Sequence, residues 1–256
     1  MTSCDHPARA ARLAMRRGEW TGPTKHSVPG YVKCNLVVLP REDAYDFLVY
    51  CQRNPKPCPL LEVTDPGDPE PKRAAPGADL RTDLSRYVVY RNGQLERACT
   101  DITDLWSQDR VAFLIGSGMS FDDALERAGV PKEQTWLYET NIETERAGRF
   151  AGPMVVTMRL MTPAHAVTAC QLTGRFVYHH GAPLHIGDPN AIGIDLAKPI
   201  VGPPLERIPD GQMALFWGCG VTPQWAALRS HIGLLIAHAP AHAFVTDWLS
   251  DQFCLP

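Results

Sequence analysis

Residues able to transfer protons or attack an electrophile stand at several turns of the sequence. His185 and Asp188 flank a glycine, and this spacing lets a carboxylate orient a histidine for proton transfer. Cys219 lies between two glycines directly before a predicted helix, whose N-terminus would lower the pKa of the thiol. His238 is a second proton-transfer candidate. The plain alternatives are a loop histidine beside a turn-forming aspartate and a small buried cysteine.

A metal site is not expected among these residues. His238 and His242 are four residues apart, the spacing of a helical zinc site, but Pro240 between them breaks the helical face. Proton transfer or nucleophilic attack without a metal is therefore the first hypothesis.

The segment AFLIGSGMSFDDALERAG, residues 112–129, predicts a buried strand, a glycine turn and a helix capped by Ser120. A dinucleotide fingerprint would need a glycine at Phe121, and the segment has neither a P-loop lysine nor the glycines of a nucleophile elbow. A turn before a helix still directs several backbone N–H groups at one place, which suits a carboxylate or phosphate. Ser117 and Gly118 are therefore candidate substrate-binding residues, and no organic cofactor is expected.

Polar side chains also flank a proline-rich segment, residues 55–84, which we expect to be one long loop. Arg53 and Asn54 precede this segment and Arg81 lies near its end. Arginine is well suited to hold a substrate carboxylate, although a solvated surface arginine is the commoner case. Thr222, expected to cap the helix after the glycine-flanked cysteine, is a further binding candidate.

Strands alternate with helices along the rest of the chain, which indicates an α/β protein. Asn92-Gly93 is a strong hairpin signal, and Thr162 followed by a proline marks a helix start. Besides the strand at the start of residues 112–129, the expected strands are residues 31–40, 152–160 and 213–220. The expected helices include residues 41–54 and 163–176.

Composition favours a small-molecule partner. The formal net charge is −3, with 25 basic and 28 acidic residues in no long blocks, so neither nucleic acid nor an anionic membrane is expected as a partner. The apolar runs are too short to span a bilayer. The eight cysteines lack CxxC spacing, which suggests reduced thiols and a cytoplasmic location.

The N-terminal stretch HPARAARLAMRRGEW is basic and helical in pattern, and it lacks the apolar core of a secretory signal. A mitochondrial targeting helix is the alternative for this stretch.

Several long blocks resemble the signature segments of one family. They are GPTKHSVPGYVKCNLVVLP, FLVYCQRNPKPCPLLEVTDPGDPEP, APGADLRTDLSRYVVYRNG, HGAPLHIGDPNAIGI, FWGCGVTPQ and HAPAHAFVTD. The family is described as hydro-lyases and is similar to the N-terminal region of mitochondrial D-glutamate cyclase. The resemblance extends from Arg9 to Asp247.

The resemblance implies a three-layer α/β/α sandwich with a smaller two-layer α/β subdomain. We expect the larger, discontinuous domain to comprise residues 1–80 and 176–256, and the smaller one residues 81–175. D-glutamate cyclase forms 5-oxo-D-proline by expelling water from D-glutamate, which is a lactam closure.

This chain departs from the pattern of its relatives at two blocks. Relatives read IGCSFSFE where this chain has IGSGMSFD, so Ser117 replaces a cysteine. They read YRTNIPC where this chain has YETNIET, so Glu139 replaces an arginine and a second cysteine is lost near Thr144. A glutamate would repel a substrate carboxylate and favour a cationic group. Glu139 and Asn141 in this block are therefore candidates for binding a substrate other than D-glutamate.

The resemblance and these residues together predict a lyase that eliminates water from a small amino acid or related carboxylate, either by cyclisation or by elimination. His185 with Asp188 would be the base, His238 a second proton-transfer group, and Cys219 a nucleophile or part of an oxyanion site. The alternatives are a dehydratase of a small hydroxy acid that gives an alkene, and a non-catalytic amino-acid-binding protein. The sequence leaves the oligomeric state open, with a homodimer as one candidate.

Overall fold

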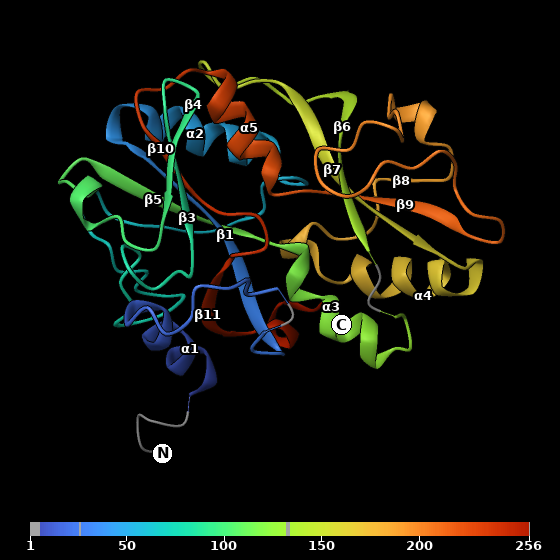
Figure 1. The fold of residues 1–256 in the computed structure, drawn as a ribbon, viewed down its shortest axis with the longest axis horizontal. Helices are drawn as coiled ribbons and strands as arrows, with labels where there is room; N and C mark the ends of the chain where they lie inside the picture. The colour runs from blue at the N-terminus through green and yellow to red at the C-terminus, as the bar shows by residue number, and fades with distance from the viewer. Residues whose placement is uncertain (1–5, 26, 132–133, 256) are drawn as a thin grey trace.

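The computed structural model describes residues 6–25, 27–131 and 134–255, which form two separate β-sheets with helices and long loops packed on them (Figure 1). Every strand pairing within the two sheets is antiparallel. The seven-stranded sheet has the order β2 (Leu60–Val63), β5 (Arg110–Gly116), β1 (Tyr31–Pro40), β10 (Leu235–His238), β3 (Tyr87–Arg91) and β4 (Gln94–Cys99), with β11 (Phe244–Leu249) also paired to β1. The four-stranded sheet has the order β6 (Thr135–Glu143), β7 (Pro153–Met161), β9 (Met213–Gly218) and β8 (His185–Ile186).

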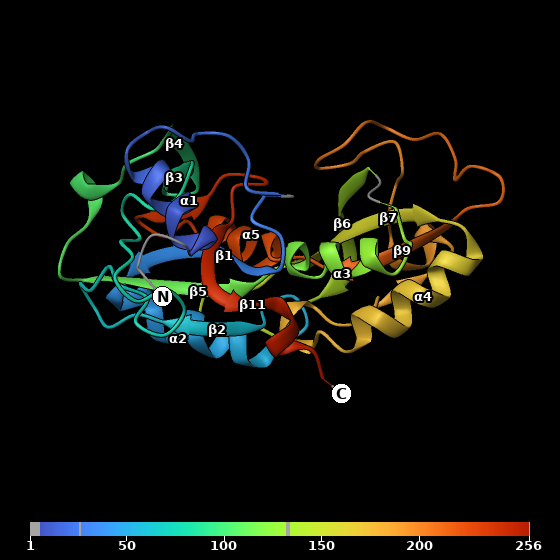
Figure 2. The same cartoon turned by 90° about the horizontal axis from the view of Figure 1, so that it is seen from below.

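Strand β1 lies inside the seven-stranded sheet, and its run Leu36–Leu39 is apolar on both faces, as expected for a strand that is covered on both sides. Leu36 and Val38 join a core cluster on one face, and Val37 and Leu39 join another on the opposite face. Helices α2 (Arg41–Arg53) and α5 (Val221–Arg229) cover the second cluster. Figure 2 shows α2 on one side of this sheet and α1 (Pro7–Arg16) on the other.

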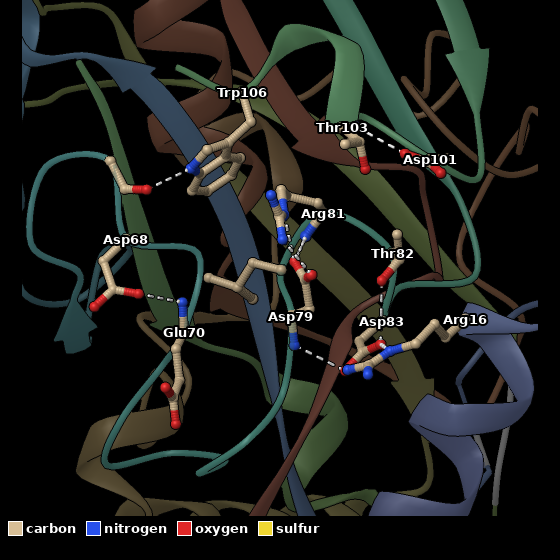
Figure 3. A network of polar contacts seen from close by, with 12 residues as sticks. Arg16, Asp68, Glu70, Asp79, Arg81, Thr82, Asp83, Asp101, Thr103 and Trp106 are labelled. Carbon is tan, nitrogen blue, oxygen red and sulfur yellow. Dashed lines mark hydrogen bonds and ion pairs between the residues drawn. The ribbon is translucent and has the colours of Figure 1, made fainter. Parts of the chain in front are cut away.

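The proline-rich segment covers the first core cluster as an ordered loop. Its Ala74, Ala75 and Leu80 are fully buried there. Side-chain bonds fix the loop: Asp83 pairs with Arg16 at 2.6 Å, and other contacts join Asp79 to Arg81, Asp68 to the Glu70 amide and Trp106 to Gly67 (Figure 3). Except for β2, the prediction of a long loop is confirmed.

The four-stranded sheet is also covered on both faces. Helices α3 (Asp122–Arg127) and α4 (Pro163–Gly174) pack against Leu215 and Trp217. The loop that follows β8 packs Ile192 and Ile194 on the other face (Figure 2). Short 3₁₀ turns occupy Thr103–Leu105, Gly118–Ser120, Val177–His179, Pro189–Ile192 and Ser250–Phe253.

The α/β class is confirmed by this mixture of helices and sheets. The three-layer sandwich stays a prediction, as do the domain boundaries. The seven-stranded sheet takes strands from residues 31–116 and 235–249, and the four-stranded sheet takes strands from residues 135–218. Within the described residues, no helix is long and apolar enough to cross a membrane.

Two predicted helix caps are wrong. The Ser120 hydroxyl bonds the backbone N–H and carbonyl of Lys33, and α3 begins after Phe121 without a side-chain cap. The Thr222 hydroxyl bonds the backbone of Val155, and α5 begins after Gly220. In both cases a neighbouring strand supplies a better partner than the helix terminus. The predicted Thr162 cap is confirmed.

Candidate active site

A cavity of about 170 Å³ lies between the two sheets and takes its lining from both. The seven-stranded sheet contributes Asn35 and His238, and the four-stranded sheet contributes Thr157, Arg159 and Trp217. The remaining polar or turn residues of the lining are Lys25, Ser117, Gly118, Asp122, Thr135, His180, Gly218, Cys219 and Gly220.

Two strands end at this cavity in glycine turns. Strand β5 ends at Gly116, where an added Cβ would lie 1.8 Å from the Tyr178 carbonyl oxygen. Beyond the end of β9, a Cβ on Gly220 would lie 1.9 Å from Nδ2 of Asn35. A side chain at position 116 would collide with the backbone of Tyr178, and one at position 220 would collide with the Asn35 side chain. The interpretation of residues 112–129 as containing a tight glycine turn is therefore supported.

Ser117 lines the cavity and caps the 3₁₀ turn that follows it. Its hydroxyl accepts a hydrogen bond of 3.3 Å from the Met119 N–H. Ser117 is buried, and Gly118 beside it packs close to Phe121. The residue that replaces a cysteine of the relatives is thus in the cavity wall.

His238 carries its ring proton on Nε2. Its Nδ1 lies 3.3 Å from the Leu36 N–H and 2.9 Å from Nε2 of Gln224, so Nδ1 accepts from both donors. Burial lowers the pKa of His238 to about 4, so the ring is neutral at pH 7 and its proton must be on Nε2. His238 is therefore a hydrogen-bond donor with an orientation fixed by two partners.

His180 has the opposite tautomer. Its Nδ1 lies 3.0 Å from the Lys56 carbonyl oxygen, which can only accept, so Nδ1 carries the proton and Nε2 has a lone pair. Burial lowers the pKa of His180 to about 4, which keeps the ring neutral. A left-handed backbone, with φ of 76°, turns this buried side chain into the cavity lining.

Sequence reasoning missed His180. The signal was the pair of adjacent histidines before Gly181, at the start of one of the signature blocks. The left-handed conformation at the end of a 3₁₀ turn separates the two: His180 lines the cavity, and His179 is fully buried among Phe176 and Phe253.

Charged residues occupy one part of the lining. Nη2 of Arg159 lies 2.6 Å from Oδ1 of Asp122, and the guanidinium lies over the rings of Phe121 and Trp217. Nζ of Lys25 donates to the Thr135 hydroxyl at 3.1 Å. Burial lowers the pKa of Lys25, an effect that Arg159 reinforces and Asp122 opposes. None of these charged residues was predicted from the sequence as a site residue.

Cys219 lines the cavity, but the expected lowering of its pKa is wrong. Burial raises the pKa of the thiol, and this outweighs the hydrogen bonds from Thr157 and the Val221 backbone. Its backbone N–H donates to the Val155 carbonyl oxygen at 3.1 Å, so this N–H is not directed at the cavity. Cys219 is a protonated thiol in the wall, and its predicted catalytic role stays a prediction.

His185 and Asp188 lie outside the cavity lining, on the edge strand β8 and the turn after it. Nε2 of His185 bonds the backbone oxygen of Asp188 at 2.8 Å. The Asp188 carboxylate instead caps the next turn by accepting from the Asn190 N–H. The expected carboxylate–histidine pair is therefore absent from the structure.

The three candidates beside the proline-rich segment are also outside the lining. Arg53 bonds the Arg146 carbonyl and lies 3.5 Å from a carboxylate oxygen of Glu145. Asn54 is buried and bonds backbone groups of Tyr50 and Glu145. Arg81 pairs with Asp79 at 2.8 Å, as Figure 3 shows.

Three further candidates have structural partners away from the cavity. Glu139 pairs with Arg229 at 2.5 Å near the surface. Asn141 is exposed on β6 and packs against Gly193. Thr222 is buried against Val155. Of the predicted residues, the structure thus brings together Ser117, Gly118, Cys219 and His238.

The protein thus has an α/β fold and a small internal cavity that is lined by two neutral histidines, two cations and a carboxylate. Among residues 6–25, 27–131 and 134–255, no group of histidine, cysteine, aspartate or glutamate side chains is arranged to hold a metal ion. The chain belongs to the D-glutamate cyclase family, whose model matches residues 111–247.

Relatives match over nearly the whole chain. A protein named "Putative hydro-lyase" from Stutzerimonas stutzeri is 52% identical, over 95% of this chain and 94% of its own. A protein from Geobacillus kaustophilus with the same kind of name is 50% identical, over 96% of this chain and 95% of its own. Among solved structures, a nitrogen repressor-like protein from Methanococcus jannaschii has a TM-score of 0.36 and 12% identity, covering 89% of this chain and 90% of that one, which is too low to inform function.

Proposed function

We propose that this protein eliminates water from a small amino acid or related carboxylate, by lactam closure of the kind that its family name describes. The observation that carries the proposal is the pair of neutral histidines in one cavity: His180 offers a lone pair and His238 offers an N–H group. Such a pair can accept a proton and stabilise a developing negative charge without a metal.

In lactam closure, a C–N bond forms between the amine and the side-chain carboxyl carbon, and one C–O bond breaks. The ammonium group first passes one proton to the carboxylate, which gives a neutral amine and a carboxylic acid. As the amine attacks, Nε2 of His180 accepts its second proton. The resulting imidazolium returns this proton to the departing hydroxyl group, and water leaves. Protons therefore balance with no net uptake or release.

His238 acts on the oxygen that remains. The tetrahedral intermediate places negative charge on this oxygen, and a neutral imidazole N–H can donate a hydrogen bond to it. The Leu36 N–H and Gln224 hold the His238 ring from behind, so this donor is oriented before the substrate arrives. Ser117, directly after the end of β5, is a further hydroxyl in the same cavity wall.

The size of the cavity supports a metabolite rather than a larger ligand. Its volume of about 170 Å³ is below the range of roughly 300–1,000 Å³ that is common for drug-sized ligands. Its lining includes Lys25, Arg159 and Asp122, groups that complement an amino acid carrying both charges.

The test is to incubate the protein with D- and L-amino acids and small hydroxy acids, and to follow products by mass spectrometry. We expect one carboxylate to give a product that is one water lighter and lacks the absorbance of a conjugated alkene. An alkene product would contradict lactam closure and show that the reaction is dehydration of a hydroxy acid. Ligands that raise the melting temperature but give no product would overturn the proposal in favour of a binding protein.

A further inference from the structure

Lys25 reaches the cavity from a loop that belongs to neither sheet. The backbone N–H groups of Thr24 and Lys25 both donate to the Ala241 carbonyl oxygen, at 2.8 and 3.1 Å. The Thr24 hydroxyl donates to the Ala243 carbonyl oxygen at 2.8 Å. Ala241 itself has a φ of 67°, a left-handed conformation that is costly for alanine. The backbone that carries Lys25 is therefore held firmly at the rim of the cavity.

The Lys25 side chain crosses to the other sheet. Nζ bonds the hydroxyl of Thr135 on β6, and Thr135 is paired in register with Arg159 on β7. Antiparallel partners in register present their side chains on the same face of a sheet. Lys25 and Arg159 thus bring two cations to the same end of the cavity.

Only one of these cations has a carboxylate partner among the described residues that line the cavity. Asp122 bonds Nη2 of Arg159, whereas the bonded partner of Lys25 is a neutral hydroxyl. Nε of Arg159 is buried and, among the described residues, has no hydrogen-bond partner. A partly buried ammonium beside a guanidinium loses hydration, and one neutral hydroxyl does not compensate for that loss. A bound anion would compensate for it by pairing with the charge.

We propose that Lys25 and Arg159 form a carboxylate-binding subsite, and that Lys25 makes the site specific for substrates that retain a carboxylate through the reaction. Arg159 is fixed by Asp122 and by two aromatic rings, so it supplies a rigid wall. Lys25 supplies the charge that a ligand can neutralise. This assignment deepens the proposed function and rests on it for the identity of the cavity as the active site.

Binding of glutarate, a dicarboxylate without an amine, tests the subsite independently of turnover. Calorimetry compares wild type with Lys25→Met, which keeps most of the length of the side chain and removes its charge. Lys198→Met is the matched control, because Lys198 is an exposed lysine paired with Asp195 on the loop after β8. Lys25→Arg restores a cation, and glutaramide is the neutral probe.

We expect Lys25→Met to weaken glutarate binding by roughly 10- to 100-fold, the range for a hydrogen bond to a charged group. Lys198→Met should bind as wild type does, Lys25→Arg should recover most of the affinity, and glutaramide should not bind. Equal affinity of wild type and Lys25→Met, or no glutarate binding to wild type, would overturn the subsite. If the subsite is confirmed while no acid is dehydrated, the proposed chemistry fails and the binding assignment stands.

Discussion

The chemistry at the residue scale depends on what Nδ1 of each histidine contacts. A carbonyl oxygen behind His180 leaves a lone pair on Nε2, and N–H donors behind His238 leave a proton there. Lys56 supplies that carbonyl oxygen, and its ammonium group donates a hydrogen bond to the Ala182 carbonyl oxygen. One residue, Lys56, thus contacts both the His180 ring and the backbone two residues further along the chain.

This arrangement predicts an unusual dependence of turnover on pH. Burial lowers the pKa of His180 to about 4, so the base stays unprotonated well below neutral pH. We expect kcat/KM on the identified substrate to stay nearly constant as pH falls from about 7 to about 5, and to decline toward pH 4 as His180 is protonated. An inflection at the ordinary histidine pKa of about 6.5 would contradict this assignment.

At the scale of elements, the N-terminal helix α1 is fixed by a buried arginine. Arg12 donates to the Val245 carbonyl at 2.9 Å and to Asp247 at 2.8 Å, and it lies over the ring of Phe244. This side chain is only 2% exposed. One basic residue of the N-terminal stretch is therefore part of the packing against β11.

Replacing that arginine should destabilise the whole fold. We expect Arg12→Met to lower the free energy of unfolding by about 2–4 kcal/mol, because Asp247 and a buried carbonyl lose their partner. Arg17→Met is the matched control: Arg17 pairs with Glu19 at the surface, where solvent screens the pair, so this change should leave the free energy of unfolding nearly as it is. Urea unfolding measures both variants, and an equal loss in the two would contradict the docking role.

Sequence patterns correctly predict the elements that depend on residues close together in the chain. Residues 31–40 form the expected strand, Asn92 and Gly93 form the expected hairpin turn with positive φ, and Thr162 caps its helix. The caps assigned to Ser120 and Thr222 were wrong because strands distant in sequence bond those hydroxyls instead.

The candidate site could be predicted only in part for the same reason. Its two glycine turns were visible in the sequence, which is why Ser117 and Cys219 were named. His180, Lys25 and Arg159 come from three distant segments, and only the packing of the two sheets brings them to one cavity. A single arginine in the apolar strand MVVTMRL was the remaining signal, since a charged residue in a buried strand needs a partner.

For the molecule as a whole, three buried histidines make the free energy of unfolding depend on pH. Burial lowers the pKa of His179 to about 3, and those of His180 and His238 to about 4. Between these values and about 6.5 the unfolded chain binds more protons than the folded one, so stability rises with pH through this window. Their contribution is complete above pH 6.5. It is lost as pH falls to about 4 for His180 and His238, with a limit of roughly 3 kcal/mol each, and to about 3 for His179, with a limit of roughly 5 kcal/mol.

His179 allows this effect to be separated from the active site. Both of its ring nitrogens are buried without a hydrogen-bond partner among the described residues. We expect His179→Leu to reduce the slope of unfolding free energy against pH between about 6.5 and 4 by roughly a third, and to preserve or raise stability at pH 7. His165→Leu, on helix α4 outside the cavity lining, is the matched control. An unchanged slope in His179→Leu would argue against the linkage.

The most direct test of the central claim is the rate of product formation by His180→Asn and His238→Gln on the substrate that the panel identifies. Asparagine tolerates the left-handed backbone at position 180, and His165→Gln is the control. We predict that each cavity variant loses at least about 100-fold in kcat/KM, while it melts as a folded protein and still binds glutarate. Full turnover in both cavity variants, with loss instead in His185→Gln, would place the chemistry at the edge strand and contradict the account.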